Sequence, residues 1–208
     1  QNTRLHRRLR RRIVSTLRNI HDAHIPSDSY SAMKLILIRH TSLNIASGIC
    51  YGQSDIDVNN TFIDEATAVK AQLADYEFDA IYTSPLQRCV KLANFCGFPN
   101  AILEPKLMEL NFGDWEGKLW DDIDDPNLQN WFNDWLNVTA TNGESFMMQY
   151  QRYVEFVNEI KTKHADQTIA LFTHGGILHC ARIHAGIDRF DNTFDYKPKY
   201  GEILAINL

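Results

Sequence analysis

Two histidines in this chain directly follow short apolar segments. His40 comes after an apolar run that ends in Arg39, and His174 comes after the run 167–173 and precedes Gly175. A single histidine is more often structural than catalytic, but a neutral imidazole nitrogen is also a nucleophile. Because the two histidines occur in similar settings beside residues that bind anions, we take both as candidate catalytic residues.

The neighbouring residues are suited to a phosphate group. Arg39 and Arg88 can each make paired hydrogen bonds to phosphate oxygens. Gly175-Gly176 opens a predicted helix, where free backbone N–H groups favour an anion. The arginines would also lower the pKa of His40 and leave a ring nitrogen free to attack phosphorus. The sequence therefore predicts a phosphate pocket of two arginines, two histidines and a helix end.

The alkoxide that leaves in such a reaction needs a proton, and Glu109 is the candidate acid. An arriving phosphate dianion would favour the protonated form of this carboxyl group. The structural alternative is an ordinary solvated glutamate after a strand. A metal site is the chemical alternative, but two arginines beside two histidines would repel a cation. We therefore expect no metal and no cofactor.

Alternating strands and helices are expected to position these residues. The pattern indicates an α/β fold with a mainly parallel sheet. Strands are predicted over 34–39, 79–83, 101–104, 167–173 and 202–207, and helices over 61–76, 84–96, 128–136, 144–164 and 175–185. Ser84-Pro85 is expected to open the second helix, with the serine as its N-cap. Because active sites of such sheets lie at the carboxyl ends of strands, His40, Arg88, Glu109 and His174 should converge.

Charge is distributed unevenly over the 208 residues. The net charge of −5 combines +5 on residues 1–32, which hold seven Arg and two Asp, with −10 on the rest. A body this acidic will not bind nucleic acid through its overall field. No apolar run approaches the roughly 20 residues needed to span a membrane. We expect a small anionic substrate attracted by a few arginines, with neither nucleic acid nor a membrane as partner.

Residues 1–32 differ in composition from the rest of the chain. Their arginines are typical of a transit peptide or a nucleic-acid-binding arm. We prefer an upstream extension, not native to the domain, with Met33 as a natural start and the domain over 33–208. If this extension is ordered, a helix is expected from Thr3 to Ile20.

The four cysteines include no C-x-x-C pair, and they do not amount to a disulfide scaffold. They are Cys50, Cys89, Cys96 and Cys180. We expect free thiols in a reducing cytosol, and therefore a cytoplasmic protein.

From residue 33 onward, the motifs resemble those of the histidine phosphatase superfamily, which includes the cofactor-dependent phosphoglycerate mutases. The matching segments are Leu37–Thr41 (R-H-G), Thr83–Arg88 (S-P-L-x-R), Glu109–Gly117, Gly143–Ser145 with Arg152 (G-E-S…R) and Thr173–Gly176. Each motif alone is weak or moderate, but their order and spacing together are specific. The resemblance implies a phosphoglycerate mutase-like, three-layer α/β/α fold.

The resemblance also implies roles for the site residues. His40 would become a phosphohistidine, which water then hydrolyses without a metal. Arg39, Arg88 and His174 would stabilise the transferring phosphoryl group. Glu109 would protonate the leaving group and later activate water.

Two departures from the family pattern bear on the substrate. Thr41 replaces the usual glycine, and Ala46 stands where an asparagine is common, with Asn44 two positions away. The R-H-T motif followed by Gly48–Asp55, which reads G-I-C-Y-G-Q-S-D, resembles the alpha-ribazole phosphatase branch. That branch removes the 5′-phosphate of alpha-ribazole phosphate during assembly of the cobalamin lower loop. The predicted substrate-loop residues are Thr41, Cys50, Tyr51 and Gly52; a tight glycine loop with a packed tyrosine is the structural alternative.

Several alternatives remain open at this point. The substrate could instead be a sugar phosphate, and a phosphoglycerate mutase or a non-catalytic phosphate-binding protein are further possibilities. The tryptophan-rich segment 115–135 is either a lid that stacks on an aromatic base or, as we prefer, a satellite hydrophobic cluster. His179 is expected on the helix surface or at the pocket rim, without a catalytic role. A monomer or a homodimer would both fit.

Overall fold

A computed structural model describes residues 32–208, so the helix predicted from Thr3 to Ile20 lies outside the described residues. The sheet contains β1 (Lys34–Arg39), β2 (Ala80–Thr83), β3 (Ile102–Leu103), β4 (Thr168–Thr173) and β5 (Ile203–Asn207). Its strand order is β3-β2-β4-β1-β5, and only β5 runs antiparallel to its neighbour. The predicted mainly parallel sheet is confirmed.

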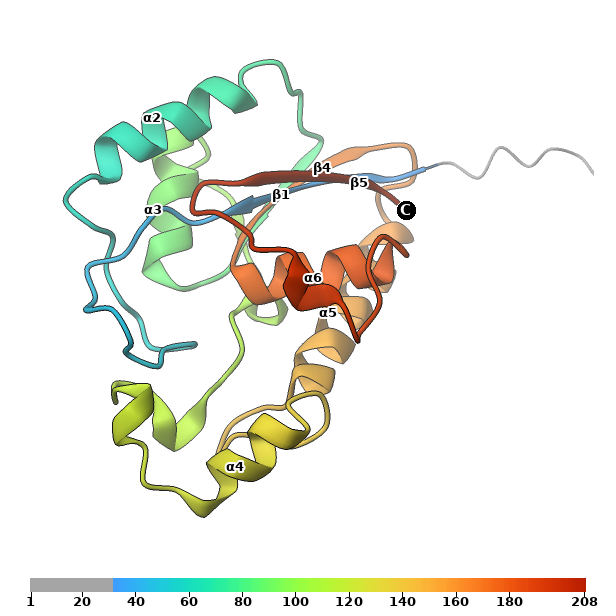
Figure 1. Cartoon of the computed structure of the whole chain (residues 1–208). Helices are drawn as coiled ribbons and strands as arrows, with labels where there is room; N and C mark the ends of the chain where they lie inside the picture. Colours follow the sequence, from blue (N-terminus) through green and yellow to red (C-terminus); the bar gives the residue numbers. More distant parts are fainter. Residues whose placement is uncertain (1–31) are drawn as a thin grey trace, which may run out of the picture. The chain divides into compact units, whose positions relative to one another are not determined.

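Helices cover both faces of this sheet. They are α2 (Phe62–Leu73), α3 (Gln87–Cys96), α4 (Pro126–Asn133), α5 (Phe146–Lys161) and α6 (Gly175–His184), with 3₁₀ turns at Pro105–Leu107, Gly113–Trp115, Trp120–Asp122 and Thr193–Asp195. Helices α2 and α3 lie on one face and α5 and α6 on the other (Figure 1). The three-layer α/β/α architecture is therefore confirmed. Within the part of the chain described, no helix is long and apolar enough to cross a membrane.

The two cores follow from the alternation of side chains along each strand. Leu35 and Leu37 of β1 pack in the cluster that contains α5 and α6. Ile36 and Ile38 pack in the cluster with α2 and α3. A strand buried on both faces reads as a continuous apolar run, which is why the sequence of β1 predicted a parallel strand.

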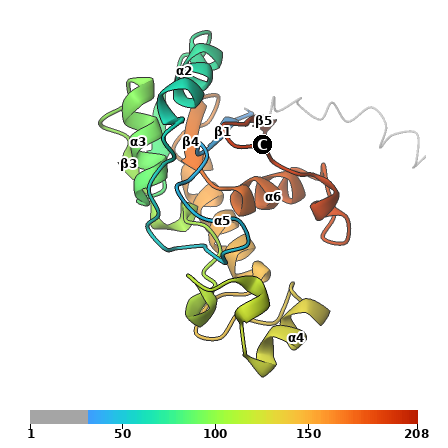
Figure 2. The ribbon, with the colours of Figure 1, turned by 60° about the vertical axis from the view of Figure 1, so that its left-hand side comes forward.

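A third, smaller cluster lies around α4, which extends away from the sheet (Figure 2). It is built from Cys50, Trp115, Ile123 and Ala140, with Phe112, Trp120, Leu128 and Trp131 packed against it. Helix α4 begins at Pro126 because Asp125 caps it by accepting a hydrogen bond from the backbone N–H of Asn127, 2.8 Å away. It therefore starts and ends earlier than the predicted range of 128–136.

The predicted start of α3 is wrong. The helix begins at Gln87 with Leu86 in an extended conformation at the N-cap, so Ser84 does not cap it. The Ser84 hydroxyl instead lies 2.8 Å from Nε2 of His174. Helix α5 begins two residues later than predicted, because Ser145 is its N-cap and its Oγ accepts a hydrogen bond from the Met148 N–H, 3.3 Å away. Both ends of β1 are as predicted, and each of the remaining boundaries matches the prediction or differs from it by at most three residues.

Candidate active site

Parallel pairing of β1 with β4 brings the two candidate catalytic histidines together. The strands are in register from Lys34 with Thr168 to Arg39 with Thr173, so His40 and His174 follow them at the same sheet edge. The backbone N–H of His40 donates to the Thr173 carbonyl at 3.0 Å. The two imidazole rings have centroids 5.2 Å apart. The predicted convergence of these residues is what the structure shows.

The His40 ring is held in a defined tautomer. Its Nδ1 lies 2.7 Å from the carbonyl oxygen of Thr41, which can only accept, so Nδ1 carries the proton and Nε2 keeps its lone pair. The side chain is 1% exposed. Burial, followed by the charges of Arg88 and Arg39, lowers the pKa of His40 well below 6.5. The neutral ring expected from the sequence is present, but burial contributes more than the arginines do.

His174 is fixed through both ring nitrogens. Nδ1 accepts a hydrogen bond from Nε of Arg88 at 3.3 Å, so Nε2 carries the proton and donates to the Ser84 hydroxyl at 2.8 Å. Burial first, and then the charge of Arg88, lowers the pKa of His174 well below 6.5. The ring is therefore neutral and rigidly oriented beside His40.

Both arginines at the site donate to backbone carbonyls. Arg88 is fully buried and donates to the carbonyls of Gly52 at 2.6 Å and Ser54 at 2.8 Å. Arg39 donates to the Pro198 carbonyl at 2.6 Å. The Nε of Arg39 and the Oγ1 of Thr41 are buried atoms without a hydrogen-bond partner. These open polar groups beside His40 are suited to hold a phosphate oxygen.

Glu109 lies within reach of this edge, and its carboxylate accepts three N–H groups. Oε1 accepts from the backbone of Leu110 at 2.9 Å and from Nε2 of Gln149 at 3.0 Å. Oε2 accepts from the backbone of Gly176, at the start of α6, at 3.2 Å. A Cβ atom on Gly176 would collide with Oε1, so only glycine lets the carboxylate approach this helix end.

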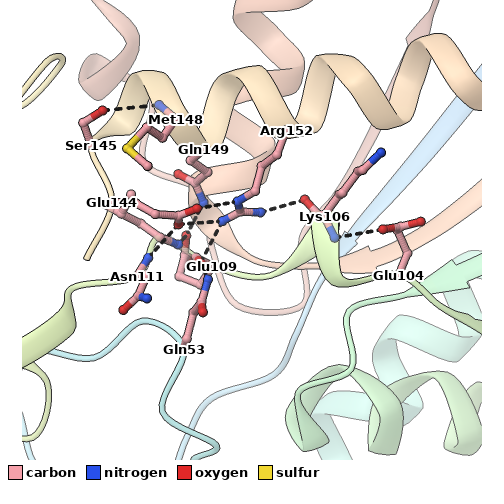
Figure 3. Close-up of polar contacts among 11 residues, drawn as sticks. Gln53, Glu104, Lys106, Glu109, Asn111, Glu144, Ser145, Met148, Gln149 and Arg152 are labelled. Atoms are coloured by element: carbon pink, nitrogen blue, oxygen red, sulfur yellow. Dashed lines mark hydrogen bonds and ion pairs between the residues drawn. The ribbon is translucent and has the colours of Figure 1, made fainter. Parts of the chain in front are cut away.

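An ion pair between Arg152 of α5 and Glu144, which precedes that helix, supports the backbone around Glu109 (Figure 3). Arg152 pairs with Glu144 at 3.0 Å and donates to the carbonyl of Glu109 at 2.9 Å and that of Lys106 at 2.7 Å. Glu144 also accepts a hydrogen bond from the Asn111 N–H at 3.0 Å. This network explains structurally why the G-E-S…R segment accompanies the glutamate.

A cavity of about 390 Å³ adjoins these groups. Its aromatic and apolar lining comes from Tyr51, Leu110, Phe112, Trp131, Trp135, Phe146, Phe194 and Pro198, and its polar lining from Arg39, Glu109, Gln149, His179, Lys197 and the backbone of Gly175 and Gly176. The candidate phosphate site therefore adjoins a cavity with a large aromatic and apolar lining.

The predicted substrate-loop residues lie in different places. Tyr51 lines the cavity, and Thr41 is buried beside His40. Gly52 is required by a close approach, because a Cβ there would collide with the Leu110 carbonyl. Cys50 is buried in the smaller cluster around α4 and does not itself line the cavity, so its assignment to the substrate loop stays a prediction.

The structure also locates Asn44, His179 and the tryptophans, whose positions the sequence left open. Asn44 is exposed and does not line the cavity. His179 is not on the helix surface: it is 7% exposed, lines the cavity and lies 3.1 Å from the Thr193 hydroxyl. The tryptophans divide between the two interpretations, because Trp115 is buried in the satellite cluster while Trp131 and Trp135 line the cavity.

Sequence reasoning missed the contacts that Gln149 and Ser84 make with the catalytic groups. The signal for Gln149 was present, since it stands on the buried stripe of α5 between Phe146 and Tyr153. A glutamine on an apolar stripe needs a polar partner. Ser84 had no such signal, because serine before proline reads as a helix cap.

The four cysteines are free and buried, as expected. Burial raises the pKa of Cys50 and Cys89 to about 12 and that of Cys96 to about 11. In residues 32–208, no three His, Cys, Asp or Glu side chains are grouped so that they could hold a metal ion.

The chain is similar to a protein family and to proteins of known name. A model of the histidine phosphatase superfamily (branch 1) matches residues 35–205. The adenosylcobalamin/alpha-ribazole phosphatase of Escherichia coli strain K12 is 32% identical over 155 residues, which cover 70% of this chain and 75% of that protein. The metal-independent phosphoserine phosphatase of Arabidopsis thaliana is 30% identical over 158 residues, which cover 70% and 65%. The solved structure of the Shigella flexneri alpha-ribazole phosphatase has a TM-score of 0.75 at 27% identity, covering 83% of this chain and 89% of that one.

Proposed function

Because the chain belongs to the histidine phosphatase superfamily (branch 1) and is thus a phosphatase of small phosphorylated molecules, we propose that it hydrolyses alpha-ribazole 5′-phosphate through a phosphohistidine on His40. The products would be alpha-ribazole and inorganic phosphate. The reaction would serve assembly of the cobalamin nucleotide loop. The names of the Escherichia coli and Shigella flexneri relatives support this substrate class.

In the first step, Nε2 of His40 attacks phosphorus, and the bond from phosphorus to the substrate's ester oxygen breaks. The neutral ring and the Nδ1–H bond to Thr41 support this role, because they leave the Nε2 lone pair free. Arg39, Arg88 and His174 stabilise charge on the phosphoryl oxygens. Glu109 in its protonated form gives its proton to the leaving ester oxygen.

In the second step, water hydrolyses the phosphohistidine. The Glu109 carboxylate, now ionised, takes a proton from the water molecule. At the same time the water oxygen bonds to phosphorus and the bond from phosphorus to Nε2 of His40 breaks. The backbone N–H groups of Leu110 and Gly176 donate to this carboxylate and hold it in place. Phosphate and the neutral imidazole are regenerated.

The aromatic cavity next to Arg39 and Glu109 is the single observation that carries the substrate proposal. A benzimidazole ring is planar and apolar, and it stacks well on aromatic side chains. Trp131 lines this cavity, and its buried Nε1–H has no hydrogen-bond partner. The one unsubstituted ring nitrogen of alpha-ribazole is an acceptor that this indole could satisfy.

The test compares kcat/KM for a panel of phosphomonoesters with EDTA present. The panel contains alpha-ribazole 5′-phosphate, ribose 5′-phosphate, phosphoserine and 3-phosphoglycerate. We expect alpha-ribazole phosphate to be preferred by at least about tenfold over ribose 5′-phosphate, because one buried ring contributes about 1–3 kcal/mol. Equal values for these two substrates would rule out the specificity, and isomerisation of 3-phosphoglycerate would indicate a mutase.

His40→Ala tests the nucleophile. This substitution is expected to lower kcat by at least about 10³-fold, because it removes the ring nitrogen that would attack phosphorus. Rapid quenching of the wild type should trap an acid-labile phosphoenzyme, which His40→Ala should not form. Tight binding of substrate without turnover by the wild type would instead indicate a non-catalytic protein.

Trp131→Leu tests the ring subsite. We expect KM for alpha-ribazole phosphate to rise about 5- to 50-fold and KM for ribose 5′-phosphate to change little, because only the former carries a ring. Phe132→Leu is the matched control, since Phe132 is the next residue of α4 but is 55% exposed and does not line the cavity. Similar effects of the two substitutions would contradict the assignment.

A second candidate is phosphoserine hydrolysis, favoured by the Arabidopsis thaliana relative. The phosphoserine carboxylate could pair with Lys197, which lines the cavity. The aromatic lining offers little else to a zwitterionic amino acid. A kcat/KM for phosphoserine above that for alpha-ribazole phosphate would establish this second candidate.

A further inference from the structure

Gln149 is a buried polar residue in contact with the carboxylate that must exchange protons. It stands in the first turn of α5, is fully buried and lines the cavity. Its Nε2 donates to Oε1 of Glu109 at 3.0 Å (Figure 3). Its own Oε1 is buried and has no hydrogen-bond partner. An unsatisfied buried amide oxygen costs about 1–3 kcal/mol, so its position calls for a functional explanation.

The three groups that donate to Glu109 are not equivalent. Leu110 and Gly176 donate through backbone N–H groups, which can never accept a hydrogen bond. All three stabilise the ionised carboxylate, whereas protonation of the leaving group requires the neutral acid. Only the Gln149 amide, which carries an acceptor as well as donors, can turn and stabilise that second form.

The space around the amide permits this turn. A Cβ atom placed on Gly176 would lie 2.7 Å from Nε2 and 2.7 Å from Oε1 of Gln149. The two ends of the amide are therefore equally close to the position that a Cβ atom of residue 176 would occupy, and rotation about the last side-chain bond exchanges atoms of similar size. The absence of a side chain on Gly176 leaves the room.

We propose that Gln149 is a positioning residue that serves Glu109 in both of its protonation states. With the carboxylate ionised, Nε2–H donates to it, as the structure shows. With the carboxyl protonated, the amide turns so that its Oε1 can accept a hydrogen bond from the O–H of Glu109. This contact holds the acid in place until its proton passes to the leaving oxygen. This inference rests on the acid/base role of Glu109 in the proposed function.

The experiment uses leaving groups that differ in their need for a proton. An alkyl phosphate releases a strongly basic alkoxide, whereas 4-nitrophenyl phosphate releases a stable phenolate. Gln149→Met, of similar length, removes both the donor and the acceptor. For Gln149→Met, we expect kcat/KM for the alkyl phosphate to fall about 10- to 100-fold. This loss is part of the roughly 10²- to 10⁴-fold effect of general acid catalysis. For the aryl phosphate, whose leaving group needs no proton, kcat/KM should change by less than about threefold.

Gln151→Met is the matched control, since it makes the same change two residues along α5 on an exposed position. It should leave both substrates unaffected, and Gln149→Leu serves as a second variant if the first folds poorly. Equal losses for the two substrates, or no loss for either, would overturn the proposal for Gln149. Failure of the wild type to hydrolyse either substrate would instead overturn the proposed function, so the two failures are distinguishable.

Discussion

Hydrogen bonds determine which ring nitrogen carries the proton in each of the two candidate catalytic histidines. The Thr41 carbonyl holds the proton of His40 on Nδ1, and Arg88 together with Ser84 determines which nitrogen of His174 carries its proton. In both rings burial is the first cause of a lowered pKa. Burial therefore favours the neutral form of His40, the proposed nucleophile, and the Thr41 carbonyl orients its ring because a carbonyl oxygen can only accept a hydrogen bond.

The Thr41 hydroxyl yields a prediction about stability and function together. Because its buried Oγ1 has no partner, Thr41→Val should raise the free energy of unfolding by about 1 kcal/mol. If the hydroxyl donates to phosphate, the same substitution should raise KM about 5- to 10-fold. Urea denaturation and steady-state kinetics measure the two effects.

Thr173→Val is the matched control for this prediction. Its hydroxyl is also buried but donates to the Leu107 carbonyl at 2.8 Å. Here the substitution should destabilise the protein by about 1 kcal/mol, because it leaves that carbonyl without a partner. A Thr41→Val protein with unchanged KM would show that the hydroxyl has no contact with phosphate.

At the scale of elements, the start of α6 and the start of α5 meet at Glu109. Helix α6 contributes a backbone N–H and a position without a side chain, and α5 contributes Gln149 and Arg152. The carboxylate itself belongs to an irregular segment after the 3₁₀ turn Pro105–Leu107. The Glu109 carboxylate is therefore held by two helices as well as by the Leu110 N–H of its own segment.

Gly176→Ala tests this arrangement. The new methyl group would collide with Oε1 of Glu109 and with the Gln149 amide, so the carboxylate must move. We expect kcat to fall at least about 10²-fold, because displacement of a general acid by an ångström removes most of its effect. The free energy of unfolding should change by no more than about 1 kcal/mol, since alanine is a better helix former than glycine. A kcat near that of the wild type would mean that the reaction does not need Glu109 in this position.

At the scale of the whole molecule, the buried neutral histidines link folding to pH. Their pKa values are lowered in the folded state, so between that lowered value and about 6.5 the unfolded chain binds more protons. Stability is therefore fully present above about pH 6.5 and is lost as the pH falls below it. Each such histidine contributes a slope of up to about 1.4 kcal/mol per pH unit.

We expect the free energy of unfolding, measured with urea between about pH 7 and pH 5, to fall steadily with pH. His40→Asn keeps an N–H near the position of Nδ1 but cannot titrate, so its slope should be smaller than that of the wild type. His174→Asn should reduce the slope in the same way. Parallel curves for wild type and both variants would show that these rings do not drive the pH dependence.

The local pattern of the sequence was enough to predict the sheet and the reacting groups. Continuous apolar runs indicate strands buried on both faces, and the topology of such sheets brings the ends of β1 and β4 together. Hence Arg39, His40, Arg88, Glu109 and His174 could be grouped before any coordinates were known. Helix ends were less predictable. A serine such as Ser84 can either cap a helix or form a hydrogen bond with a side chain distant in sequence, here the ring of His174.

Only the tertiary structure decided what surrounds the phosphate site. Cys50 and Tyr51 are adjacent in sequence, yet one packs among tryptophans and the other lines the cavity. Gln149 became relevant only when α5 met Glu109 beside Gly176. Sequence periodicity reports which side of an element is buried, but the partner that a buried side chain meets depends on how separate elements pack. The histidine phosphatase family was therefore predictable from the sequence, whereas the contact between Gln149 and Glu109 and the lining of the cavity were not.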